Sequence, residues 1–377
     1  MTSRERIRAV LAHKEPDRTP VDLGSTNVSS LHINAYQKLL KMLDIKDNNV
    51  QFIDFGQQLV VPCDEFVKKL GVDTKALKIL GSKTTKLQFL NKDQSEYKDV
   101  WGIIWRKPEG GLYYDSVVNP LANLEDIDAV ADYPWPGVDD LCSDTGLRDI
   151  ARPIYENSDL SIVGSCGGSI FMLAQDLRGY ENFLMDIMVE KELANYILDR
   201  ITELRIAMAE RLLGQAGEYI DIVKIGDDLG GQNSPLISLE LFRELIKPRT
   251  EKLIRFIKEH SNAAVLYHCC GSMRCFIPDL IEIGVDILNP IQTQAADMNP
   301  LALKKDFGEK IVFWGGIDTQ KTLSKGKPED VRAEVRERIV QMGKGGAYVI
   351  CASHNIQADV PPENVLAMVE EAKTAYL

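Results

Sequence analysis

The chain has 377 residues, of which 45% are hydrophobic and 27% are charged, a composition typical of a globular protein with a sizeable core. Its formal net charge of -12 repels phosphate backbones and anionic lipid, so a small molecule or another protein is a better partner than nucleic acid or a membrane surface. The sequence has no uncharged apolar run of about 18 residues, and we expect no signal peptide at its N-terminus. Its seven cysteines, an odd number, are scattered along the chain, so we expect free thiols in a reducing cytoplasm.

The first 130 residues are the least regular part of the chain. Residues 3–11 have an amphipathic helical pattern, with Thr2 and Glu5 at the capping-box spacing. Residues 19–24 (TPVDLG) are typical of a short strand, and residues 31–43 of a helix. From 86 to 119, alternating apolar stretches separated by NKD and PEGG predict an antiparallel β-meander. We interpret this meander as an excursion from a single domain spanning residues 1–377, with a proline-containing linker at 131–140.

After residue 150, short apolar runs alternate with helical patterns. The runs lie at 160–166, 219–226, 263–268, 285–290, 311–316 and 347–351, and the helical patterns at 183–213, 239–260, 274–283, 300–307, 328–342 and 362–376. Such alternation predicts a parallel sheet covered by helices. Six strands here, with one or two from the N-terminal part, fit an α/β fold of the (β/α)8 TIM-barrel type. A doubly wound open sheet is the alternative, although neither GxGxxG after a strand nor GxxxxGK[ST] occurs.

Metal-type residues gather where the predicted strands end, which is where barrels place their active sites. One strand ends on His268, and Cys270 lies on the same face because side chains alternate along an extended segment. A neutral imidazole and a thiolate suit tetrahedral zinc, and a third thiolate would leave an open catalytic position. Cys351, at the end of the last strand, is the natural third ligand. Cys275 and His354 are the other candidates.

Other strand ends carry polar side chains. Asp227 and Asp228 follow one strand and are candidate catalytic residues, although aspartates beside glycines are also common in turns. A second group offers candidate substrate contacts, each with a structural role as its alternative: Cys166, Gln232, Asn233 and Trp314.

The chain resembles the uroporphyrinogen decarboxylase superfamily, and in particular its corrinoid-dependent methyltransferase branch. The resemblance rests on RERIRAVLAHKEPDRTPVD near the N-terminus, ADYPWPGVDD, GDDLGGQNSPLISLELFRELIKPRTEKLI, YHCCGSMRCFIPDLIEIGVDILNPIQ and PPENVLAMVEEA, in this order. It implies a barrel enzyme whose zinc is held by a His-x-Cys pair and one later cysteine, which fall on His268, Cys270 and Cys351.

The resemblance also implies a reaction. We expect a zinc-dependent methyltransferase that moves a methyl group between a thiol or methoxylated compound and the cobalt of a corrinoid (cobalamin) carried by a separate protein. None of the five histidines lies in the Asp-x-His-x-x-Gly context of cobalamin-binding modules. A metal-free decarboxylase is one alternative, but residues 20–30 (PVDLGSTNVSS) lack the arginines that the decarboxylases carry there. A non-catalytic protein that binds a corrinoid or small ligand is the other.

Overall fold

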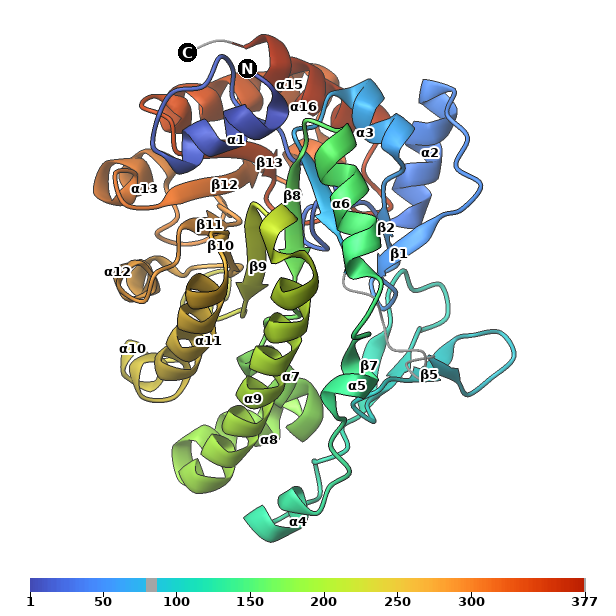
Figure 1. Cartoon of the computed structure of the whole chain (residues 1–377), viewed down its shortest axis with the longest axis vertical. Helices are drawn as coiled ribbons and strands as arrows, with labels where there is room; N and C mark the ends of the chain where they lie inside the picture. The colour runs from blue at the N-terminus through green and yellow to red at the C-terminus, as the bar shows by residue number, and fades with distance from the viewer. Residues whose placement is uncertain (79–86, 376–377) are drawn as a thin grey trace.

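The computed structural model describes residues 1–78 and 87–375. Seven parallel strands form one curved sheet in the order β13-β12-β11-β10-β9-β8-β3 (Figure 1). Consecutive strands along the chain are neighbours in this sheet, as they are in a barrel. The strands are β3 (Thr74–Leu77), β8 (Ser161–Ser165), β9 (Ile222–Gly226), β10 (Ala264–His268), β11 (Ile287–Asn289), β12 (Val312–Ile317) and β13 (Tyr348–Ala352).

An N-terminal segment closes this sheet into a barrel. Val21 forms a parallel bridge with Ile350 of β13. Its carbonyl oxygen accepts a hydrogen bond of 2.9 Å from the amide of Asp73, immediately before β3. The Asp73 carboxylate in turn accepts from the Val21 amide at 2.8 Å and pairs with Arg6 at 2.6 Å. The segment around Val21 therefore occupies the eighth position, between β13 and β3, and confirms the predicted (β/α)8 architecture.

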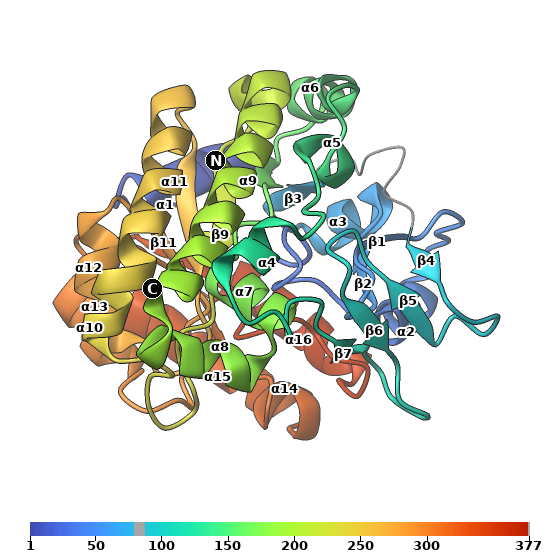
Figure 2. The same cartoon turned by 90° about the horizontal axis from the view of Figure 1, so that it is seen from below.

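Helices surround the barrel and its N-terminal elaboration (Figures 1 and 2). They are α1 (Ser3–Leu11), α2 (Ile33–Leu43), α3 (Asp64–Leu70), α4 (Ile127–Ala131), α5 (Val138–Leu141), α6 (Leu147–Asn157), α7 (Phe171–Arg178), α8 (Tyr180–Val189), α9 (Lys191–Ala216), α10 (Leu239–Leu241), α11 (Lys247–His260), α12 (Ile277–Glu282), α13 (Pro300–Phe307), α14 (Thr322–Lys325), α15 (Pro328–Arg338) and α16 (Pro362–Thr374). Within the described ranges, no helix is long and apolar enough to span a bilayer.

Three long helical predictions are interrupted in the structure. The helix expected over 328–342 is α-helical only to Arg338, and a π-helical turn follows at Ile339–Gly343. The helix expected over 183–213 is two helices, α8 and α9, which meet at Glu190. No glycine or proline marks this break, so the periodicity could not reveal it. The helix expected over 239–260 contains a π-helical turn at Phe242–Ile246. Pro248 follows it and has no amide hydrogen to donate to Glu244, which is why the α-helical ladder cannot continue there.

The predicted meander is a four-stranded antiparallel sheet in the order β4-β5-β6-β7. Its strands are β4 (Gln88–Phe89), β5 (Glu96–Lys98), β6 (Ile104–Arg106) and β7 (Asp115–Val118), and a hairpin of β1 (Gln51–Asp54) and β2 (Leu59–Val61) precedes it. Residue 86, the first of the predicted excursion, lies outside the described residues. The meander lies beside the barrel at the end away from α1 (Figure 1). The single-domain organisation stays a prediction.

The barrel interior is packed with apolar side chains at the end that α1 covers. Ile7 and Val10 of α1 join one buried cluster with Ile222, Leu266 and other inward residues of the strands. The capping box of Thr2 and Glu5, which the sequence predicts, fixes the start of this helix. Because α1 covers this end of the barrel, the carboxyl ends of the strands are left for a site.

Candidate metal centre

His268 and Cys270 lie together at the carboxyl end of β10. The Nε2 atom of His268 is 3.3 Å from the Sγ atom of Cys270. The two side chains share a face because one residue separates them in extended backbone. His268 is buried and Cys270 half-buried, so the donor pair is held within the fold.

His354 is the third member of this group. It follows β13 by two residues, and one potential ligand atom from each of His268, Cys270 and His354 lies within 4.8 Å of the others. The two imidazole rings have centroids 6.3 Å apart. Two nitrogens and one sulfur form a donor set that zinc prefers. The three side chains can therefore hold a metal ion and leave one position open.

Cys351 occupies a different place from that of His354. Its side chain is 1% exposed and packs with Val349 and Trp314 in the interior cluster of the barrel. Its Sγ atom lies 3.2 Å from the carbonyl oxygen of Ala352, to which it donates. The described structure thus brings His354 to the His268–Cys270 pair, whereas Cys351 as a zinc ligand stays a prediction.

Asn289 at the end of β11 orients the His268 ring. Its Oδ1 atom is 2.7 Å from His268 Nδ1, and its Nδ2 atom donates to the carbonyl oxygen of Trp314 at 3.2 Å. Because the amide nitrogen is committed to Trp314, Oδ1 must accept the proton of Nδ1, which leaves the Nε2 lone pair facing Cys270. Such a partner is what fixes a metal-binding histidine. The sequence reasoning missed Asn289, although it too ends a strand.

The two neighbouring aspartates have different surroundings. The Oδ1 atom of Asp228 accepts from the Cys270 amide at 2.9 Å and lies 3.5 Å from His268 Nε2. Asp227 is 1% exposed, and its carboxylate accepts from the amides of Ile170 and Met172 at 3.0 Å, at the start of α7. Burial raises the pKa of Asp227 to about 6. Asp228 therefore belongs to the site, and Asp227 anchors a helix.

The candidate substrate contacts from the sequence are not members of this group. Cys166 is buried among the apolar side chains of the outer core. Trp314 is fully buried, and its Nε1 atom donates to Asp22 at 2.9 Å. Gln232 and Asn233 are exposed. None of the four lines the cavity over the metal centre.

That cavity has a volume of about 610 Å³ and covers the mouth of the barrel. Asp228, His268 and His354 line it from the strand ends. Aromatic side chains of the β1–β2 turn and the meander line it from the other side: Phe55, Tyr97, Trp105 and Tyr114. These rings pack edge-to-face or stacked, with centroids 5.0 Å apart for Tyr97 and Tyr114 and 6.5 Å for Tyr97 and Trp105. The β1–β2 turn and the meander thus place aromatic side chains along the cavity, together with the carboxylates of Asp54 and Asp99.

Burial sets the protonation of the groups in the site. The pKa of His268 is lowered to about 4, chiefly by burial and against the nearby Asp228 carboxylate. The imidazole is therefore neutral near pH 7, which is the form that binds metals. Burial raises the pKa of the Cys270 thiol, and a metal ion would supply the positive charge that its thiolate needs. Burial, followed by the Asp99 carboxylate, raises the pKa of Asp176 in the same cavity to about 7.

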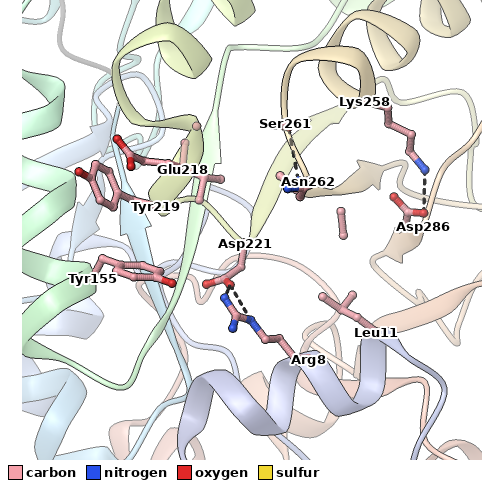
Figure 3. A pocket seen from close by; sticks show the side chains of 14 residues that line it. Arg8, Leu11, Tyr155, Glu218, Tyr219, Asp221, Lys258, Ser261, Asn262 and Asp286 are labelled. Atoms are coloured by element: carbon pink, nitrogen blue, oxygen red, sulfur yellow. Dashed lines mark hydrogen bonds and ion pairs between the residues drawn. The ribbon is translucent and has the colours of Figure 1, made fainter.

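A second groove lies at the opposite end of the barrel, against α1 and the starts of β9, β10 and β11 (Figure 3). Its charged side chains are already paired, Arg8 with Asp221 at 2.9 Å and Lys258 with Asp286 at 2.8 Å. Barrel enzymes place their chemistry at the carboxyl ends of the strands. We therefore assign the site to the mouth that holds His268 and not to this groove.

The fold and the site together make this protein a (β/α)8 barrel with a candidate metal centre, formed by a histidine–cysteine group at the carboxyl ends of its strands. The family model for uroporphyrinogen decarboxylase (URO-D) matches residues 117–375, which is more than half of the chain. The chain belongs to the uroporphyrinogen decarboxylase family.

Known proteins agree with this assignment at low identity. The chain is 26% identical over 232 residues to uroporphyrinogen decarboxylase of Rickettsia felis, covering 59% of this chain and 63% of that protein. It is 24% identical over 273 residues to the Legionella pneumophila enzyme of the same name, covering 69% and 72%. The chain thus spans less than two thirds of the Rickettsia protein. A methyltransferase from Methanosarcina mazei shares the fold over 99% of this chain and 98% of its own, with a TM-score of 0.65 and 19% identity.

Proposed function

We propose that this protein is a zinc-dependent methyltransferase that moves a methyl group between a small substrate and the cobalt of a corrinoid bound to a separate protein. The observation that carries the proposal is the group of His268, Cys270 and His354 at the mouth of a uroporphyrinogen decarboxylase-family barrel. The fold shared with the Methanosarcina methyltransferase supports it.

The donor chemistry of the site fits zinc. His268 offers an Nε2 lone pair because Asn289 binds its Nδ1 proton, and Cys270 and His354 add sulfur and nitrogen. Zinc bound there would supply a Lewis acid that lowers the pKa of a substrate thiol or polarises the heteroatom that carries a methyl group. Asp228 holds the Cys270 backbone in place. Asp176, which lines the same cavity and has a pKa of about 7, can exchange a proton with the substrate.

The cavity argues against a polycarboxylate substrate. No arginine is present among the described residues that line it, and its wall includes Asp54, Asp99, Asp176 and Asp228. Such a surface repels a ligand with many carboxylates. The decarboxylase alternative is favoured by the names of the curated relatives, and it predicts turnover by the metal-free protein.

The test is zinc content by elemental analysis of the purified wild type and single variants. We expect close to one zinc per chain in the wild type and its loss in Cys270→Ser and His268→Ala. His354→Ala and Cys351→Ser decide the third ligand, because only the variant that lacks a true ligand should lose zinc. Cys275→Ser is the matched control, since Cys275 is exposed and outside the group. A wild type that stays metal-free after incubation with zinc would refute the proposal.

Activity is the second measurement. The zinc-loaded protein, mixed with a methylated corrinoid protein and a series of thiols, or with a reduced corrinoid protein and methoxylated compounds, should transfer a methyl group. The change in the cobalt absorbance spectrum reports the transfer. Methyl transfer at the same rate by the zinc-free protein would contradict a role for zinc in the reaction, and no transfer by the zinc-loaded protein would favour the decarboxylase alternative.

A further inference from the structure

The meander presents one of its faces to the cavity over the metal centre. Tyr97 of β5 and Trp105 of β6 are direct cross-strand partners, so their side chains share a face. Asp99 comes two positions after Tyr97 and therefore lies on that face as well, and all three residues line the cavity. Glu96 lies on the opposite face, where it pairs with Arg106 at 3.0 Å. The inner face of the meander thus combines aromatic rings with a carboxylate.

Tyr97 is the central ring of an aromatic group on this side of the cavity. Its ring centroid lies 5.6 Å from that of Phe55, 5.0 Å from that of Tyr114 and 6.5 Å from that of Trp105. Tyr97 is only 5% exposed, yet its hydroxyl makes no hydrogen bond with any residue that the structure describes. Most buried polar atoms are paired, so this hydroxyl is available to a bound molecule. The negative faces of aromatic rings attract cations.

The carboxylates beside these rings lack a cationic partner. Asp99 accepts from the Nε1 atom of Trp105 at 2.8 Å, and its charge contributes to the raised pKa of Asp176, so these two carboxylates are close enough to repel each other. The Asp176 side chain makes no hydrogen bond or ion pair with any described residue. Lys224 of β9 is the one lysine or arginine among the described residues that line the cavity, against four aspartates. A cationic ligand would offset this excess of negative charge.

We propose that the meander side of the cavity binds an ammonium group of the substrate. The rings of Tyr97 and Trp105 contact its carbon atoms, and the carboxylates of Asp99 and Asp176 are its counter-ions. The term substrate here rests on the proposed function, whereas the cation site rests on the rings and carboxylates themselves. His268 lines the same cavity from the strand ends, so a molecule held by its ammonium group can place a sulfur or an oxygen at the metal centre. The substrate class is therefore a small thiol or methyl ether that carries an ammonium group.

Choline is a probe that tests the cation site separately from zinc chemistry. Isothermal titration of the full chain, as purified and again after zinc removal by a chelator, would compare choline with neutral 3,3-dimethylbutan-1-ol and the anion 3,3-dimethylbutanoate. The three ligands have nearly the same shape and differ in charge. We expect choline to bind about tenfold more tightly than the alcohol, because cation–π contact and carboxylate counter-ions act on its charge alone. The anion should bind most weakly.

Variants assign the preference for choline over the alcohol to individual residues. Asp99→Asn and Asp176→Asn should each reduce it a few-fold, and the double variant should abolish it. Trp105→Leu should reduce it, whereas Tyr97→Phe, which keeps the ring, should retain it. Glu96→Gln is the matched control and should retain it, because it removes the same charge from the outer face of the meander. Thermal unfolding shows which variants are folded; if Asp99→Asn is not, the wild type and Asp176→Asn, whose carboxylate has no partner to lose, decide the test.

Three results would overturn the cation site. The first is a wild type that shows no measurable binding of choline, and the second is a wild type that binds choline and the alcohol equally. The third is an unchanged preference in folded Asp176→Asn and in the folded double variant. None of these results bears on zinc content, and a wild type without zinc leaves the binding comparison intact, so the failures of the two proposals can be told apart.

Discussion

Replacement of Asn289 by alanine is the sharpest test of how the candidate metal centre is built. The substitution removes the acceptor 2.7 Å from His268 Nδ1 and the donor to the Trp314 carbonyl oxygen. His268 and Asn289 are buried, so water cannot readily replace the lost acceptor. The His268 ring can then rotate or take the tautomer whose Nε2 carries the proton, and that tautomer cannot bind a metal through Nε2.

The expected losses of zinc affinity and of stability in Asn289→Ala follow from these contacts. Loss of a partner of a metal-binding histidine typically weakens metal affinity about 10–100-fold, which is about 1.4–2.8 kcal/mol. The unpaired Nδ1 hydrogen would also destabilise the fold by about 1–3 kcal/mol. Asn289→Asp keeps an acceptor for Nδ1, so its zinc affinity should remain within about threefold of the wild type.

Competition with a chromophoric chelator measures the zinc affinity of each variant, and urea unfolding measures its stability. The control is Asn364→Ala. Asn364 is also buried, and its Nδ2 atom donates to the carbonyl oxygens of Leu323 and Gly326, away from the site. The Asn364→Ala variant should be less stable than the wild type but keep its zinc affinity. Asn289→Ala with the zinc affinity of the wild type would show that Asn289 does not orient a metal ligand.

Three further predictions concern stability. Because the pKa of Asp176 is raised from 3.8 to about 7, the folded protein keeps a proton that the unfolded chain releases between these pH values. The stabilisation that this proton gives the folded state is fully present below pH 3.8 and is lost as the pH rises through 7. Asp176→Asn should therefore be more stable than the wild type at pH 8 by about 1–3 kcal/mol in urea unfolding, and equal stability would contradict the assignment. Asp227→Ala leaves the amides of Ile170 and Met172 unpaired and should cost about 2–4 kcal/mol with zinc content unchanged; lost zinc in a folded variant would assign it to the site. Gly226→Ala places a Cβ 2.2 Å from the His268 carbonyl oxygen and should lower the melting temperature, whereas Gly214→Ala, with nothing within 4 Å, should not.

Much of the barrel could be predicted because its strands and helices carry local signals. Strands buried on both faces are continuous apolar runs, and the runs at 263–268 and 347–351 correspond to β10 and β13. The start of α1 was predictable from the spacing of Thr2 and Glu5 alone. The juxtaposition of His268 and Cys270 could also be predicted from the sequence, because extended backbone places alternate residues on one face.

The contacts of each site residue were harder to predict from the sequence. Asp227 and Asp228 are adjacent and chemically identical, and only the position of α7 directs one to a helix and the other to the metal centre. His354 and Cys351 are both close to the end of β13. The chain leaves the strand between them, so one side chain reaches the centre and the other stays in the barrel interior.

The sequence by itself determined the order of most strands and helices and the juxtaposition of His268 and Cys270 at the end of β10, because hydrophobic period, capping and strand alternation act over a few residues. Tertiary structure alone decided the rest. The Val21 segment closes the barrel beside a strand more than 300 positions away, and aromatic side chains of the meander line the cavity over the metal centre. These features depend on which surfaces meet after folding, and no local pattern records such long-range contacts.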